Sequence, residues 1–122
     1  MTKFQNSKQY DLEDRTLKFA KQIRSFVTKL KNTPANIEDR RQLIRSSGSI
    51  GANYIEANEA LSKKDFVMRI KICRKGAKES RYWLRLINTT DDKGELEQER
   101  IDLENEASEL THIFGSIVTK SE

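Results

Sequence analysis

Apolar residues recur at alternating spacings of three and four in four separate segments of this 122-residue chain. This spacing places them along one side of an α-helix. In the first segment the recurring positions are Leu12, Thr16, Phe19, Ile23, Phe26 and Leu30. The same spacing returns from Leu43 to Leu61, from Phe66 to Ile87 and from Leu96 to Ile117. The predicted helices run over residues 11–31, 34–61, 63–88 and 95–119.

Capping residues and turn formers mark the ends of these helices. Asp11 is a favoured N-cap for the first helix, and Thr33-Pro34 is a favoured start for the second. Ser62 precedes the third helix, and a polar stretch that ends in Gly94 precedes the fourth. Because short connections make successive helices antiparallel neighbours, we predict a single all-α domain over residues 1–122, folded as an up-down-up-down four-helix bundle.

Two glycines interrupt the second helical segment. Within a helix, Gly48 and Gly51 each cost about 1 kcal/mol relative to alanine. The close approach of a second helix usually offsets that cost. We therefore predict that Gly48 and Gly51 are close-packing positions.

The third helical segment carries more apolar surface than the core of one bundle requires. A second row of apolar and small residues lies roughly 120° around the helix from the core positions. This apolar stripe consists of Met68, Ile72, Gly76, Trp83 and Leu86. Exposed apolar patches usually mark interfaces, so we predict a homo-oligomer joined through the apolar stripe. The alternative is that neighbouring helices of the same bundle cover it.

Charge is distributed unevenly along the chain. Residues 62–93 hold 10 Lys/Arg and 4 Asp/Glu, a net +6, whereas residues 94–122 hold 2 and 8, a net −6. Most of the positive charge lies on one side of the third helix. This basic stripe consists of Lys71, Arg74, Lys75, Lys78, Arg81 and Arg85. Arg40, Arg41 and Arg45 on the second helix are placed to extend it.

A row of cations along a helix contacts nucleic-acid phosphates without reading base sequence. We therefore expect the basic stripe to bind structured RNA. The alternative is a solvated surface that the acidic fourth helix neutralises, within one subunit or between two. The chain is then a protein-interaction scaffold that does not bind nucleic acid.

No set of residues converges on catalysis or metal binding. Glu109 and His112 form an E-x-x-H pair, but a dimetal bundle needs two such motifs, and the chain has one histidine. The segment 46–51 lacks the Lys-Ser/Thr ending of a phosphate loop. Cys73 lies among core positions, where a thiol is buried and inert. We expect no enzyme activity, cofactor, metal or small-molecule substrate.

Cysteine content and hydropathy indicate a compartment. A lone cysteine excludes an intrachain disulfide, which favours a reducing environment. No apolar signal segment is visible, and the central uncharged run is too short and too polar to span a bilayer. We expect a cytoplasmic protein that does not enter membranes.

One long motif gives the chain a family signature. It is SGSIGANYIEANEALSKKDF, Ser47–Phe66, followed by Tyr82-Trp83-Leu84. Tyr10–Glu13 and Thr33–Asn36 fit the same pattern. The chain resembles the four helix bundle proteins encoded in intervening sequences of bacterial 23S rRNA. The resemblance implies a ring-shaped homopentamer of antiparallel bundles with no known catalytic activity and no cofactor, and the genetic setting of the family suggests a role with ribosomal RNA.

Overall fold

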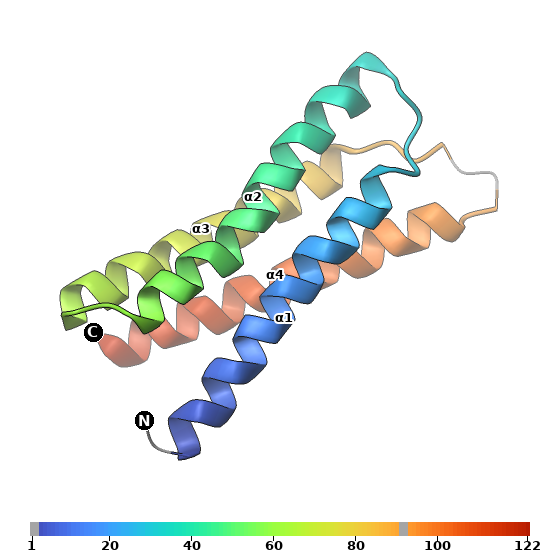
Figure 1. Cartoon of the computed structure of the whole chain (residues 1–122). Coiled ribbons are helices and arrows are strands. Elements are labelled where there is room, and N and C mark those ends of the chain that lie inside the picture. The colour runs from blue at the N-terminus through green and yellow to red at the C-terminus, as the bar shows by residue number, and fades with distance from the viewer. Residues whose placement is uncertain (1–2, 91–92) are drawn as a thin grey trace.

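The computed structural model describes the backbone of residues 3–90 and 93–122 and the side chains of residues 12–90 and 93–122. The fold consists of four α-helices: α1 (Lys3–Val27), α2 (Pro34–Asn58), α3 (Lys63–Leu86) and α4 (Glu95–Ser121). Successive helices run in opposite directions and pack side by side, and α1 also contacts α4 (Figure 1). The predicted all-α up-down bundle is therefore confirmed. The ring of subunits stays a prediction.

Three helices begin where the sequence predicts them. Thr33 Oγ1 accepts a hydrogen bond from the Asn36 backbone N–H at 3.1 Å, at the start of α2. Ser62 Oγ accepts one from the Asp65 backbone N–H at 3.0 Å, at the start of α3. Gly94 adopts a left-handed φ of 77° immediately before α4. These local signals keep the connections short and the neighbouring helices antiparallel.

The first helix differs from its predicted range of 11–31. It begins at Lys3 and ends at Val27, so Asp11 lies inside the helix and is not its N-cap. Residues 3–10 contain neither Gly nor Pro, so nothing in the local sequence stops the helix from starting earlier. The Asp11 side chain is outside the described residues.

The C-terminal ends of the other helices also shift by two or three residues. α3 ends at Leu86 and not at residue 88, and α4 continues to Ser121 and not only to residue 119. α2 ends at Asn58 and not at residue 61, because its last turn tightens into hydrogen bonds between residues three apart. Leu61, predicted on the core side, therefore lies in a turn and is 99% exposed.

All four helices contribute to one apolar core. The six residues of the first pattern, Leu12 to Leu30, are all buried. Across the core, the Tyr54 ring of α2 meets the Phe114 ring of α4 with centroids 5.8 Å apart. Over the described residues, no helix has a stretch long and apolar enough to cross a membrane.

The glycines of α2 differ in how closely another helix approaches them. A Cβ added at Gly51 would lie 3.0 Å from Thr16 Oγ1, so α1 and α2 meet closely at that point. A Cβ added at Gly48 would meet only the Arg24 guanidinium, at 3.7 Å. Since 3.7 Å is an ordinary van der Waals contact, the prediction of close packing needs correction at Gly48.

Gly76 does not lie on the outward apolar stripe, which corrects its predicted role. It is buried between α3 and α2, where an added Cβ would lie 2.7 Å from Ser49 Oγ and 3.1 Å from the Ser46 carbonyl oxygen. Beside it, the hydroxyls of Ser46 and Ser80 form a buried hydrogen bond of 2.9 Å. Gly76 therefore permits the close α2–α3 contact.

Candidate nucleic-acid interface

The two ends of the basic stripe on α3 are paired with carboxylates of α4 and of Glu122, the residue that follows it. Arg81 Nε lies 3.8 Å from Glu104 Oε2, and Arg85 Nε lies 4.0 Å from the same oxygen. At the opposite end, Lys71 Nζ lies 3.2 Å from Glu122 Oε2. Neutralisation by the acidic fourth helix, one of the two interpretations drawn from the sequence, therefore applies to these three cations.

Glu104 also belongs to a charged cluster that joins the start of α4 to the end of α3. Arg100 Nη1 donates to Glu104 Oε1 and to the Leu84 carbonyl oxygen, each at 3.1 Å. The same guanidinium donates to both carboxylate oxygens of Glu97, at 2.8 and 2.7 Å. These hydrogen bonds lower the pKa of Glu97 and raise the pKa of Arg100. Because three guanidinium groups share Glu104, it neutralises only part of their combined charge.

The middle of the basic stripe has no acidic partner among the described residues. Arg74, Lys75 and Lys78 lie more than 4.0 Å from every carboxylate in that part of the chain. Glu106 and Glu109 flank the part of α4 that lies beside Lys78, but both bind an arginine of α1 on the other side of the helix. Glu79, on α3 itself, lines the α2–α3 side near Lys75 without pairing with it, so positive charge remains uncompensated mainly around Arg74 and Lys78, which face α4.

A notch of about 280 Å³ lies between α3 and α4 beside this uncompensated charge. This α3–α4 notch is lined by Lys78, Arg81, Ser108, Thr111 and His112. Close to the notch, the side chain of Arg74 passes over Gly115, where an added Cβ would lie 3.8 Å from Arg74 Cδ. Two helices thus form one pocket, with cations on the α3 side and polar groups on the α4 side.

Lys75 belongs to a different part of the surface. It lines a second notch of about 260 Å³, between α2 and α3, together with Arg45 and Trp83. Of the three predicted α2 arginines, Arg45 lines this notch with Lys75. Arg40 donates to a carbonyl oxygen at the end of α1 at 3.3 Å, and Arg41 lies 3.8 Å from a glutamate of its own helix. The basic stripe is therefore two surfaces and not one continuous row.

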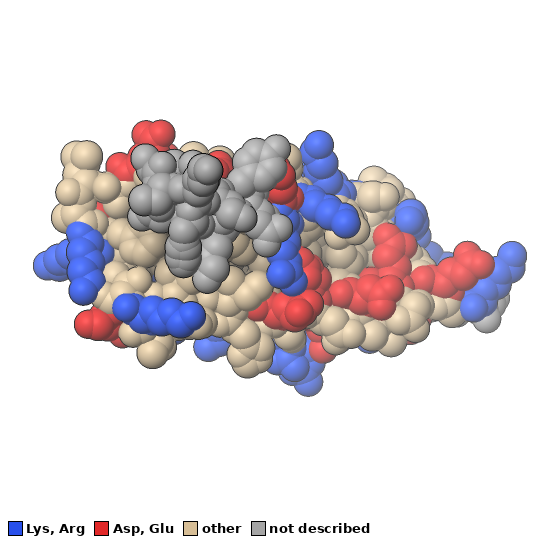
Figure 2. All heavy atoms as spheres, turned by 90° about the horizontal axis from the view of Figure 1, so that it is seen from below, with Lys and Arg blue, Asp and Glu red and all other residues tan. Residues whose placement is uncertain are grey.

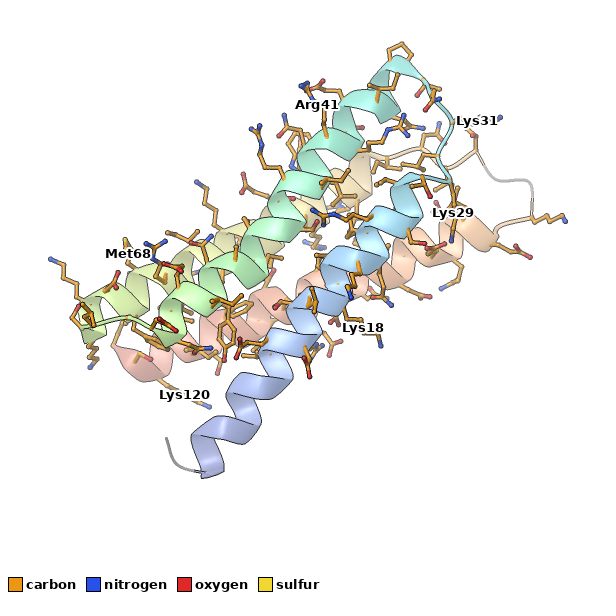
Figure 3. The ribbon with its side chains drawn as sticks, viewed as in Figure 1. Lys18, Lys29, Lys31, Arg41, Met68 and Lys120 are labelled. Atoms are coloured by element: carbon orange, nitrogen blue, oxygen red, sulfur yellow. The ribbon has the colours of Figure 1, made fainter. Side chains whose placement is uncertain are left out.

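The apolar stripe leaves an exposed surface on the outer side of α3. Met68 and Leu86 are 46% and 49% exposed, and Met68 lies on the outer side of the bundle (Figure 3). Ile72 and Trp83 are half-buried, and Trp83 packs against the core. Tyr82, absent from the prediction, is 56% exposed and meets the Trp83 ring edge-on with centroids 5.2 Å apart. Its position four residues before Leu86 was the available signal.

Acidic residues gather on the other side of α4. A groove of about 660 Å³ between α1 and α4 is lined in part by Asp14, Glu99, Asp102 and Glu106. Arg15 of α1 donates two hydrogen bonds of 2.8 Å to Glu106. Seen from below, acidic side chains follow one another along half of the molecule (Figure 2). We refer to this groove as the α1–α4 groove.

Comparison with protein families places the chain. The model of the 23S rRNA-intervening sequence protein family matches residues 4–116. The chain belongs to this family. The resemblance drawn from Ser47–Phe66 is thereby confirmed.

A solved structure extends this relation to three dimensions. It is the crystal structure of a protein with unknown function from the S23 ribosomal protein family of Bacteroides thetaiotaomicron VPI-5482. The two chains are 31% identical, with a TM-score of 0.73, over 88% of this chain and 97% of the other. No curated protein matches the chain. Membership of the 23S rRNA-intervening sequence protein family thus accounts for the fold and assigns no specific activity.

Two other side chains that could carry chemistry in this family member, Cys73 and Glu109, are held in hydrogen bonds within the bundle. Cys73 is buried, its Sγ donates to the Ile50 carbonyl oxygen at 3.4 Å, and burial raises its pKa to about 12. Such a thiol stays protonated at neutral pH and reacts slowly. Glu109 accepts a hydrogen bond from Arg15 at 3.3 Å. In the described ranges no three His, Cys, Asp or Glu side chains are grouped to hold a metal ion.

The α4 side of the α3–α4 notch was missing from the sequence interpretation. That interpretation omits Ser108 and Thr111 and considers His112 only as a metal ligand. The three residues have the spacing i, i+3, i+4, which places them on one side of a helix. Spacing cannot say which helix that side meets, because this depends on how α4 is rotated against α3.

Proposed function

We propose that this chain is a non-enzymatic, oligomeric bundle that binds structured RNA through its phosphate groups. The observation that carries the proposal is the uncompensated charge at the centre of α3. Arg74 and Lys78 are held next to a stretch of α4 whose carboxylates bind α1 on the other side. A phosphate chain would supply the missing negative charge. Lys71, Arg81 and Arg85, already partly neutralised, would add weaker contacts.

The arrangement suits phosphates better than base edges. The cations are long side chains on the outside of a straight helix, and the grooves of A-form RNA give such side chains little access to base sequence. Phosphate contacts of this kind are sequence-independent and depend strongly on salt. The name of the family connects it with 23S rRNA, which supports RNA as the anion.

We further propose that subunits assemble in the cytoplasm as a ring-shaped homopentamer through the exposed part of the apolar stripe. Met68, Tyr82 and Leu86 are each about half exposed on α3, and apolar surface of this kind is a candidate for burial between subunits. Light scattering should give five times the chain mass of 14.2 kDa. Replacing Met68 and Leu86 by Glu should lower that mass, and a monomer mass for the unaltered protein would contradict the assembly.

Binding of a fluorescent RNA hairpin tests the RNA proposal. We expect affinity to fall steeply between about 50 and 200 mM salt. The double variant Arg74→Glu/Lys78→Glu should lower affinity more than about tenfold and reduce the salt slope by about one for each lost phosphate contact. The control Lys18→Glu/Lys21→Glu makes the same charge change on α1 and should keep affinity within about threefold, since it leaves the phosphate contacts intact.

The two double variants distinguish a local contribution of the centre of α3 to RNA affinity from an effect of the overall charge of the protein. Equal losses in the two double variants would mean that overall charge controls binding and that the centre of α3 has no special role. Absence of binding by the unaltered protein at the lowest salt would overturn the RNA proposal.

A scaffold without nucleic-acid binding is the second candidate. The pairing of Lys71, Arg81 and Arg85 with α4 carboxylates favours it, because the same pairing could form between subunits. This candidate predicts that Arg74→Glu/Lys78→Glu changes the oligomer mass. The RNA proposal predicts an unchanged mass and a loss of RNA binding only.

A further inference from the structure

We infer that the α3–α4 notch is a phosphate subsite to which α4 contributes Ser108 and His112 as hydrogen-bond donors. This inference rests on the proposed function. It gives a role to the α4 side of the notch, which is not part of the basic stripe and to which membership of the family assigns no function.

The shape and lining of the notch fit one phosphate group. Its volume of about 280 Å³ leaves room for a phosphate group. Lys78 and Arg81 supply positive charge from α3. The two helices therefore present charge and hydrogen-bond donors to the same space, as anion binding requires.

The three polar side chains of α4 do not contribute equally. The Thr111 hydroxyl donates to the Ala107 carbonyl oxygen at 2.8 Å, so its proton is already used. Ser108 and His112 have no hydrogen-bond partner among the described residues. Their hydroxyl and ring N–H groups are consequently the α4 donors available to a phosphate oxygen.

The charges around His112 are specific and limited. From α3, Lys78 and Arg81 line the notch with it, and Arg74 passes over Gly115 close by. Arg81 is also paired with Glu104 of α4 at 3.8 Å. On its own helix, Glu109 lies one turn earlier and is paired with Arg15 of α1 at 3.3 Å. No described carboxylate lines the notch. The imidazole therefore lies beside cations whose charge a phosphate would neutralise.

The experiment measures binding of a fluorescent RNA hairpin at constant pH and ionic strength. Ser108→Ala and His112→Ala should each weaken binding by roughly two- to tenfold, the size of one lost hydrogen bond. Ser116→Ala, at an exposed serine of α4 outside the notch, should leave the affinity unchanged.

Because His112 is the only histidine, its ring signals in an NMR spectrum need no assignment by mutagenesis. Adding the RNA hairpin should shift those signals. Equal shifts with inorganic phosphate at the same phosphate concentration would assign the notch to a free anion and overturn the inference. Unchanged RNA affinity in both Ser108→Ala and His112→Ala would overturn the subsite alone. Absence of RNA binding by the unaltered protein would overturn the proposed function with it.

Discussion

The two sides of α4 differ in how completely their acidic residues neutralise the basic residues of the neighbouring helix. On the α1 side, acidic residues of α4 meet basic residues of α1. Arg15 binds Glu106 through two 2.8 Å hydrogen bonds, and Nζ of Lys29 (labelled in Figure 3) lies 3.0 Å from Glu99. On the α3 side, carboxylates stand only at the two ends, and the centre keeps its positive charge. The net charge of a helix therefore does not predict where unpaired charge remains on the surface. That depends on the direction in which each α4 side chain points.

The largest stability effect is expected where α3 and α4 are joined most firmly. Arg100→Met would leave Glu97, Glu104 and the Leu84 carbonyl without their shared donor. Its side chain is only 14% exposed. We expect the free energy of unfolding to fall by about 2 kcal/mol, in the range for losing hydrogen bonds to charged groups. Urea denaturation measures it, and a change below about 0.5 kcal/mol, the range of ordinary surface substitutions, would contradict this role.

The contrast between the two sides can be removed by adding an acid to the α3–α4 notch. Ser108→Glu places a carboxylate opposite Lys78 and Arg81, as Glu106 lies opposite Arg15. We expect RNA affinity to fall about tenfold, equivalent to about 1.4 kcal/mol, with the fold retained in circular dichroism. Ser116→Glu is the matched control, and an equal loss in that variant would contradict a local effect.

A smaller stability effect is expected from the α1–α4 groove. Arg15→Ala removes a bidentate pair in which both side chains are partly exposed, at 29% and 24%. Solvent screening limits the loss to about 1 kcal/mol. Lys29→Ala, at 51% exposure, should cost less than about 0.5 kcal/mol. A larger effect for Lys29 than for Arg15 in urea denaturation would reverse this order.

The smallest effect concerns acid pH. Hydrogen bonds from Arg100 hold the pKa of Glu97 below its ordinary value of 4.5 in the folded protein. The contribution of Glu97 to stability is therefore complete above about pH 4.5 and is lost as the pH falls through the lowered pKa. In Glu97→Gln, the free energy of unfolding should change less over this range. Parallel acid titrations of the two proteins would contradict this assignment.

Sequence reasoning predicts what depends on one helix at a time. Apolar spacing identifies the buried side of each helix, and Thr33 and Ser62 mark two helix starts, because amphipathicity and capping are local properties. It does not predict that Gly76 is buried, since a position at the flank of a helix is covered or open according to how closely α2 approaches. It also cannot separate Arg81, which Glu104 meets, from Lys78, which no described carboxylate meets. That distinction depends on the rotation of α4 about its own axis.

The burial of Cys73 has a consequence for observing the motions of this bundle. The thiol is fully covered, and its hydrogen bond to Ile50 lies where α2 and α3 are in contact. A thiol reagent can reach it only when that contact opens, so the rate of labelling reports how often the two helices separate. Because the chain has no second cysteine, all of the labelling reports on this one contact. Comparing the labelling rate with and without RNA would show whether a ligand bound between α3 and α4 also slows the separation of α2 from α3.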